Sequence, residues 1–308
     1  MFKIAKKLAL IAAPIFIYFA VFIYFEPYNY FGLKHSEYNA DSAIVRVREY
    51  TSAPSDVVIL GDSRMAHFDM GEVEEYVGEK VGQLSFGGAS FNESMDLLEY
   101  ALEQNDNLHT VYFGVSFYTL NESYYKDRMS QIKTIAKNPF AYMLNFNYTI
   151  EMVGEIKYAL KGEKNVALKN EGKWDTEDYY FADGTLRPYR KNLEEYASKI
   201  IYPVCENYIL DKADIKRYMA LAQRCAKEGI TLYTVLPPMD NSLKDLVIEP
   251  LGIGEDILYF IDEIKDYTTV LNYEYNEENP FSSDEFYDGF HLDVVRGMPR
   301  FTKMLFER

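Results

Sequence analysis

Basic residues are scarce in this 308-residue chain, which carries 32 Lys and Arg against 48 Asp and Glu, for a formal net charge of −16. Proteins bind the phosphates of nucleic acids through a basic surface, which such a chain lacks. We therefore exclude nucleic acid as a partner. A strongly acidic balance instead suits a secreted or cell-envelope protein.

Histidine and cysteine are also rare, with four and two residues. None of them has the spacing that is typical of a metal site, so we expect no metal and no cofactor. Cys205 and Cys225 could form a disulfide in an exported protein, or they could remain two buried free thiols. Neither has the sequence context of a catalytic thiol.

Charge is absent from the apolar run Leu8 to Phe25, which contains one proline, Pro14. About eighteen apolar residues can just span a bilayer core. Lysines precede the run and Glu26 follows it. The positive-inside rule then predicts that residues 1–30 form a short cytoplasmic tail and a transmembrane anchor, with the rest of the chain at the cell surface. A cleaved signal peptide and a buried core helix are the alternatives, but the aromatic residues at 22–28 favour an uncleaved anchor.

Short apolar runs that are typical of buried strands recur along residues 55–308, with helical patterns between most of them. The five runs are Val57–Leu60, Val81–Phe86, Thr110–Val115, Thr231–Leu236 and Thr269–Leu271. Helical patterns at Ser94–Gln104 and Ala213–Lys227 suit crossover connections. The alternation predicts a three-layer α/β/α domain with a mainly parallel five-stranded sheet.

Two segments fall outside this alternation. Residues 31–54 would connect the anchor to the α/β domain, and a stretch at about 120–211, rich in Tyr, Asn and Lys, is interpreted as an insertion. Placed at the carboxyl ends of the strands, the insertion would form a lid over a site there. The alternative is a peripheral packing subdomain remote from the site.

The strand predicted at 57–60 runs into Gly61, Asp62 and Ser63, and residues 64–70 can continue as a helix. Catalytic groups of α/β proteins gather at such strand ends. Unpaired backbone N–H groups at the start of a helix would stabilise an oxyanion beside Ser63. Ser63 is therefore our candidate nucleophile.

A serine hydroxyl is a weak nucleophile that needs a base, and the base needs a third group to orient it. Near the other end of the chain, Asp288 and His291 are three residues apart. One turn of chain can bring this carboxylate beside the imidazole. Ser63, Asp288 and His291 are thus the predicted catalytic residues.

Each motif also has a plainer interpretation. Gly-Asp-Ser is a common turn, a serine after a strand is often a helix cap, and Asp-Gly-Phe-His can be a tight turn whose histidine only packs. The presence of both segments in one chain favours catalysis. His67, four residues after Ser63, is the only rival base, whereas His35 and His109 have little support.

With a strand-Gly-Asp-Ser segment early and an Asp-x-x-His segment just before its last helix, the chain resembles the SGNH/GDSL hydrolase superfamily. The resemblance implies a flavodoxin-like fold in which Ser63 is the nucleophile, His291 the general base and then acid, and Asp288 the residue that orients His291. The chain is also similar to the membrane-anchored members that act in D-alanylation of teichoic acids and in alginate acetylation.

The resemblance further implies an oxyanion hole. The family's second block donates a glycine N–H, and Gly88, or alternatively Gly87, occupies that place in this chain. The family's third block normally supplies an asparagine, which is absent here: Ser116 would replace it, and Asn121 lies further away. Ser63, Gly88 and Ser116 are the predicted donors, and loss of a side-chain donor typically costs about 10²–10³ in rate.

Together these features predict extracytoplasmic, serine-dependent O-acyl transfer or ester hydrolysis through an acyl-Ser63 intermediate. The expected substrate is a cell-surface polysaccharide or teichoic acid, and a membrane-bound acyltransferase would be the partner that supplies the acyl group. The alternative is a catalytically weak SGNH-like protein that binds or assembles glycan alongside such an acyltransferase.

Overall fold

The chain forms two compact units in a computed structural model, which describes residues 2–33, 37–38, 41–162, 169–170, 192–276 and 279–307. Unit 1 consists of Met1–Arg48 and Gln131–Lys173, and unit 2 of Glu49–Ser130 and Trp174–Arg308. Part of the insertion predicted at 120–211 therefore belongs to unit 1. Residues 163–168 and 171–191 of that insertion lie outside the described residues.

Unit 1 is mainly helical. Its elements are α1 (Phe2–Phe25), β1 (Glu37–Tyr38), α6 (Pro139–Met143), α7 (Phe146–Lys161) and β5 (Lys169–Asn170), and it shares α2 (Ala43–Ser52) and α5 (Met129–Lys137) with unit 2. The strands β1 and β5 pair antiparallel. Tyr142 is fully buried, stacks on Tyr30 and donates a hydrogen bond from its hydroxyl to Glu26 over 2.8 Å. A buried carboxylate thus meets a donor inside this aromatic cluster, as a buried charge requires.

The predicted transmembrane anchor has no counterpart among the described helices. Among the residues described, no helix is long and apolar enough to cross a membrane. Within the predicted run, the side chains of Leu8 and Ala9 lie outside the described residues.

Unit 2 is built on a five-stranded sheet, as the sequence predicted. The strands are β2 (Val57–Leu60), β3 (Val81–Gln83), β4 (Thr110–Gly114), β6 (Thr231–Leu236) and β7 (Thr269–Asn272). They lie in the order β3-β2-β4-β6-β7, and all four pairings are parallel. Buried, β-branched and aromatic residues make up most of these runs, as expected of a parallel sheet covered on both faces.

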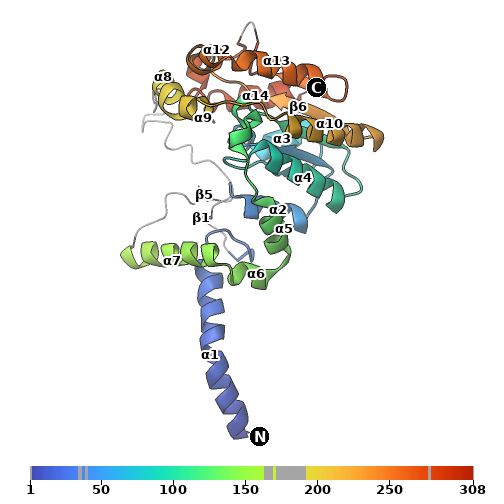
Figure 1. The fold of residues 1–308 in the computed structure, drawn as a ribbon. Helices are drawn as coiled ribbons and strands as arrows, with labels where there is room; N and C mark the ends of the chain where they lie inside the picture. Colours follow the sequence, from blue (N-terminus) through green and yellow to red (C-terminus); the bar gives the residue numbers. More distant parts are fainter. Residues whose placement is uncertain are drawn as a thin grey trace. The chain divides into compact units, whose positions relative to one another are not determined.

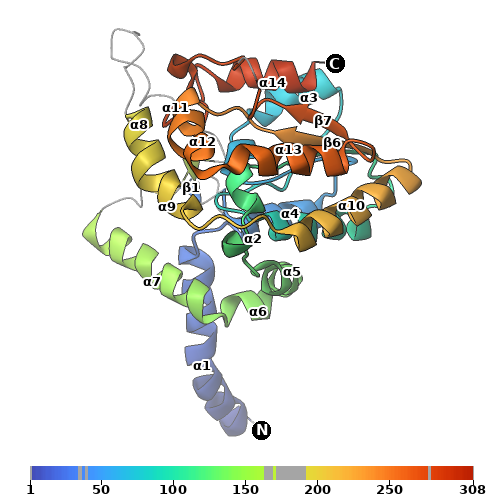
Figure 2. The same cartoon turned by 45° about the horizontal axis from the view of Figure 1, so that its top comes forward.

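Helices cover both faces of the sheet (Figures 1 and 2). The α-helices of unit 2 are α3 (Met70–Val77), α4 (Phe91–Gln104), α8 (Leu193–Tyr196), α9 (Tyr202–Cys205), α10 (Lys212–Lys227), α11 (Asn241–Leu243), α12 (Glu249–Leu251), α13 (Ile253–Ile264) and α14 (Met298–Phe306). The 3₁₀ turns are η1 (Ser63–Met65), η2 (Phe117–Leu120), η3 (Glu122–Tyr124) and η7 (Ser283–Glu285), and π-helical turns occupy η5 (Ala197–Ile201) and η6 (Lys244–Ile248). The three-layer α/β/α prediction is confirmed.

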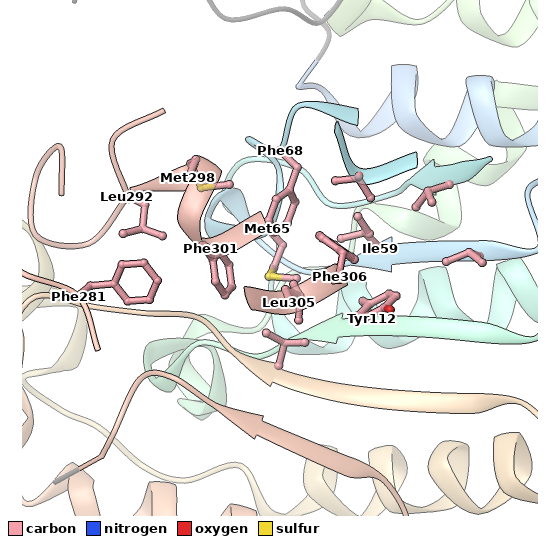
Figure 3. Close-up of a cluster of buried hydrophobic side chains, with 14 of the residues drawn as sticks. Ile59, Met65, Phe68, Tyr112, Phe281, Leu292, Met298, Phe301, Leu305 and Phe306 are labelled. Carbon is pink, nitrogen blue, oxygen red and sulfur yellow. The ribbon is translucent and has the colours of Figure 1, made fainter. Parts of the chain in front are cut away.

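Side chains of alternate strand residues pack into two separate hydrophobic cores, one on each face of the sheet. Ile59 and Tyr112 face α3 and α14, where they pack with Phe301 and Phe306 in the cluster shown in Figure 3. On the opposite face, Phe113 packs edge-on against Phe91 of α4 and lies 4.8 Å, centroid to centroid, from the ring of Tyr218 of α10. The period of two along each strand produces this division.

Local capping explains where α4 begins. The sequence predicted a helix from Ser94, whereas α4 starts at Phe91 because Ser90 and Glu93 form a capping box. The second predicted run, Val81–Phe86, is also shorter in the structure: β3 ends at Gln83, although Leu84 and Phe86 still donate backbone hydrogen bonds to Ile59 and Gly61.

The strand order positions the site. In chain order the five strands are arranged 2-1-3-4-5, so the winding direction of the sheet reverses between β2 and β4. In open α/β sheets ligands bind at the carboxyl ends of the strands beside such a switch point. Ser63 follows β2 there, and Ser116 follows β4.

Candidate active site

Ser63 begins a single 3₁₀ turn at the end of β2. Asp62 caps this turn by accepting a hydrogen bond from the backbone N–H of Arg64 over 3.0 Å. The helix predicted over residues 64–70 does not form, because Asp69 caps a new helix, α3, that starts at Met70. Ser63 itself is half-buried, so part of its surface is exposed to solvent.

Two glycines allow the ends of β2 and β4 to approach each other closely. Gly61 has φ +135°, and a Cβ added there would lie 3.1 Å from the Cα of Gly114. A Cβ on Gly114 would lie 2.2 Å from Cγ of Met65, which is fully buried. Larger residues would push the serine turn away from β4.

His291 and Asp288 lie in a tight turn between η7 and α14. An isolated antiparallel bridge joins Phe286 to Leu292, and the N–H of Tyr287 donates to the carbonyl of His291 over 2.8 Å. Gly289 at the tip has φ +79°, a left-handed conformation that glycine adopts readily. The turn therefore presents the acid and the imidazole from one rigid piece of chain.

The structure brings the three predicted catalytic residues together. The Oγ atom of Ser63 lies 2.8 Å from Nε2 of His291. The Nδ1 atom of His291 lies 2.9 Å from Oδ2 and 3.1 Å from Oδ1 of Asp288. An ionised carboxylate only accepts, so Nδ1 carries the proton and Nε2 is left to accept from the serine. The spacing is that of a nucleophile, a base and an orienting acid.

Asp288 is held in its charged form. Its burial would raise the pKa of this carboxyl, but hydrogen bonds from the imidazole of His291 and from the N–H groups of His291 and Phe290 outweigh it and lower the pKa below 3.8. The charge is therefore present at neutral pH, where it stabilises a protonated imidazole.

Backbone donors for an oxyanion are available near the serine. Within the described parts of the chain, the N–H groups of Ser63, Gly87 and Gly88 donate to no protein acceptor. The carbonyl of Gly88 accepts from Nζ of Lys126 over 2.8 Å and from Nη2 of Arg128 over 2.9 Å. These contacts fix the orientation of the peptide that follows Gly88. The role of Gly88 in an oxyanion hole stays a prediction.

Ser116 has a different set of partners. Its hydroxyl donates to Oδ2 of Asp62 over 2.7 Å and accepts from Nη1 of Arg64 over 3.1 Å, and it is almost fully buried. The single proton of this hydroxyl is thus directed at Asp62 and not at the position of an oxyanion. Asn121 accepts from the N–H groups of Ser123 and Ile209. It therefore joins the segment that follows β4 to the segment that precedes α10.

The remaining histidines take other positions. The ring of His67 lies 5.9 Å from that of His291, centroid to centroid, whereas the imidazole in hydrogen-bond contact with Ser63 is that of His291. His109 contacts Thr110 and Glu79. His35 lies outside the described residues.

Sequence reasoning missed a buried charged network beside the serine. The guanidinium of Arg64 donates to Glu274, to the carbonyls of Pro237 and Pro238, and to Ser116. A charged residue in a polar stretch of sequence is normally exposed to solvent, so nothing in the sequence indicated that Glu274 is buried beside Arg64. Arg64 could have been suspected only from its position next to Ser63.

Asp62 and Glu274 complete this network. Asp62 also accepts from the hydroxyl of Tyr118 over 2.6 Å, and Glu274 accepts from the backbone N–H of Phe117 over 3.1 Å. Burial raises the pKa of Glu274 to about 7, although the charge and hydrogen bonds of Arg64 act in the opposite direction. The pKa of Tyr118 is likewise raised, first by burial and then by the charge of Asp62.

The structure also describes the two cysteines and the groups that could bind a metal. Cys205 and Cys225 are both free and buried, so the disulfide alternative does not apply. In the described ranges, no three His, Cys, Asp or Glu side chains are grouped so as to hold a metal ion.

Comparison with known proteins adds little to this geometry. No protein-family model and no curated protein matches the chain. Among solved structures, the chain is similar to a protein of Bacteroides fragilis whose assignment as an acylhydrolase is itself provisional, with 10% sequence identity and a TM-score of 0.37. The alignment covers 85% of this chain and 96% of that one. At this level of similarity the neighbour's activity does not bear on the present chain.

Proposed function

We propose that this protein catalyses serine-dependent ester hydrolysis or O-acyl transfer through an acyl-Ser63 intermediate. The observation that carries the proposal is the 2.8 Å contact between Oγ of Ser63 and Nε2 of His291, whose other nitrogen is bound by the buried carboxylate of Asp288. Nucleophile, base and orienting acid are hydrogen-bonded in series, as acyl transfer requires.

The first half of the reaction forms the acyl-enzyme. His291 takes the proton of Ser63 as Oγ attacks the carbonyl carbon of an ester or thioester, and Asp288 stabilises the imidazolium. The N–H groups of Ser63 and Gly88 stabilise the negative oxygen of the tetrahedral intermediate. His291 then gives its proton to the leaving alcohol or thiol, and the acyl group remains on Ser63.

The second half transfers the acyl group to an acceptor. Water, or a hydroxyl of a glycan, loses its proton to His291 and attacks the acyl-serine through the same oxyanion contacts. We propose an acceptor of the cell-surface polysaccharide or teichoic-acid class, outside the cytoplasm, with a membrane-bound acyltransferase as the source of the acyl group. The support for this narrower proposal is the sequence resemblance to cell-envelope SGNH members.

One observation favours the second candidate function, a catalytically weak glycan-binding or assembly protein. The side-chain donor that would replace the family's asparagine, Ser116, is engaged by Asp62 and Arg64. The oxyanion would then rely on backbone donors, and absence of a third donor typically costs about 10²–10³ in rate.

The test is to incubate the full chain with p-nitrophenyl acetate and to follow released nitrophenol and the intact mass. We expect an acetyl adduct or turnover that is lost in Ser63→Ala and in His291→Ala. Tyr218→Phe is a suitable control. It removes a buried hydrogen bond between α10 and Thr234 of β6, and neither residue contacts Ser63, Asp288 or His291. Acetylation that persists in Ser63→Ala, or its absence from the folded wild type, would contradict the proposal.

A further inference from the structure

The two residues on either side of Ser63 both carry buried charges. Asp62 and Arg64 expose only 3% and 4% of their surfaces. Both side chains contact the same hydroxyl, because Ser116 donates to Asp62 and accepts from Arg64. The backbone of Ser63 is therefore tied to the end of β4 on both sides.

The guanidinium of Arg64 also reaches the ends of two further strands. It donates to the carbonyls of Pro237 and Pro238, which follow β6, and to Glu274, which lies just beyond β7. A planar guanidinium can donate to several fixed acceptors at once, whereas an ammonium group is a single charge at the end of a flexible side chain. Arg64 thus links the serine turn to the carboxyl ends of β4, β6 and β7.

The same guanidinium touches the turn that carries the base. Its Cζ atom lies 4.7 Å from the centroid of the Phe290 ring, and Phe290 directly precedes His291. Phe290 is buried and also packs edge-on against Tyr118, whose hydroxyl binds Asp62. The side chain of the residue that follows Ser63 therefore contacts the residue that precedes His291.

We infer that Arg64, held by Glu274, is a positioning residue that sets the distance and direction between Ser63 and His291. The inference rests on the function proposed above, because it concerns the alignment of that acyl-transfer dyad.

The energetics of buried ion pairs support this role over a purely stabilising one. Arg64 and Glu274 have side chains exposed by only 2% and 0%. Desolvation commonly cancels the attraction within such a pair, and well-packed apolar replacements are often as stable. Apolar residues could fill the same space, but they would neither donate hydrogen bonds to the ends of β4, β6 and β7 nor place a cation against the ring of Phe290.

The experiment compares Arg64→Met/Glu274→Leu with wild type in turnover of p-nitrophenyl acetate. Replacement of both charges leaves no unpaired carboxylate at position 274, but the carbonyls of Pro237 and Pro238 and the N–H of Phe117 lose their partners, so we expect a folded protein with a melting temperature below that of wild type. We expect kcat to fall about a hundredfold, the loss that a misplacement of about 1 Å can cause, while KM stays nearly unchanged. A purely structural role predicts that kcat, measured well below the melting temperature of the variant, equals that of wild type.

Arg64→Lys tests the same point in a variant that keeps the charge. Lysine cannot bind all the acceptors of the guanidinium at once, so we expect a folded protein with reduced kcat and little change in KM. The control is Arg217→Met, which removes an arginine that joins α10 to Asp96 and Glu99 on α4. It should leave kcat unchanged.

The outcomes separate the two proposals. If wild type shows Ser63-dependent turnover and both Arg64 variants match its kcat, the positioning role is wrong and the proposed function stands. If wild type shows no Ser63-dependent turnover, the proposed function fails and the inference fails with it.

Discussion

At the scale of single residues, Asp288 determines which nitrogen of His291 faces the serine. Its Oδ1 atom accepts from the N–H groups of Phe290 and His291, which fixes the carboxylate within its own turn. Its Oδ2 atom is then directed at Nδ1 of His291 over 2.9 Å. The imidazole is held in the tautomer that can accept the proton of Ser63.

Asp288→Asn should therefore reduce turnover strongly without unfolding the protein. The amide can donate to Nδ1, which favours the tautomer with its proton on Nε2, where the base is needed. We expect kcat for p-nitrophenyl acetate to fall by about 10³–10⁴. Turnover near that of wild type would remove Asp288 from the mechanism.

Thermal unfolding across acidic pH gives an independent check on the same variant. The pKa of Asp288 is lowered in the folded protein from 3.8, so its charge stabilises the fold above pH 3.8 and this contribution is lost as the pH falls through the lower, folded value. The stability advantage of wild type over Asp288→Asn should shrink in that acidic range. An advantage that grows on acidification would contradict the assignment.

At the scale of elements, the close approach of β2 and β4 determines where the serine turn sits. Gly114 leaves the space that the side chain of Met65 occupies, and Met65 belongs to the same 3₁₀ turn as Ser63. The packing of η1 against β4 thus depends on a missing Cβ. This contact links the position of Ser63 to the register of the sheet.

Gly114→Ala should destabilise unit 2, because its Cβ would lie 2.2 Å from Cγ of Met65. Overpacking of this kind costs about 1–3 kcal/mol, measurable as a lower midpoint in urea. In a Met65→Ala background the cost of Gly114→Ala should be smaller, because the clashing atom is gone. Gly154→Ala in α7, where a Cβ meets nothing within 4 Å, is the control and should not destabilise. Equal costs in both backgrounds would exclude the proposed contact.

At the scale of the whole molecule, the triad and both cysteines belong to unit 2. Burial is the main factor that raises the pKa of Cys205 to about 12 and of Cys225 to about 11. Thiolate, the reactive form, is therefore scarce while the fold is intact. These thiols can report on unfolding of the unit that holds the site.

We expect an Ellman assay on native protein to find neither thiol, and an assay in denaturant without reductant to find both. With increasing urea, thiol reactivity should appear together with the loss of near-UV circular dichroism. Reaction of either thiol in the native protein would show that the surrounding helices open locally. A count of zero in denaturant would mean that the cysteines are paired.

The sequence predicted the sheet well and the surroundings of the serine poorly. Apolar runs such as residues 57–60 and 231–236 are the observed strands, because the covering of both faces leaves a continuous buried pattern. The helix expected directly after Ser63 did not form, since Asp69 caps a separate helix. The apolar run at residues 8–25 predicted a membrane span that is not found among the described helices.

What the sequence by itself determined about this protein is the α/β layering, together with Ser63, Asp288 and His291 as the candidate catalytic residues. Hydrophobic periodicity is local, and few residue types can perform nucleophilic catalysis, so both can be recognised without coordinates. Only the tertiary structure decided that Ser116 binds Asp62 and that Arg64 pairs with Glu274, 210 residues away. The packing of distant strands decides whether a polar side chain is buried and which partner it contacts. No local sequence pattern predicts either of these.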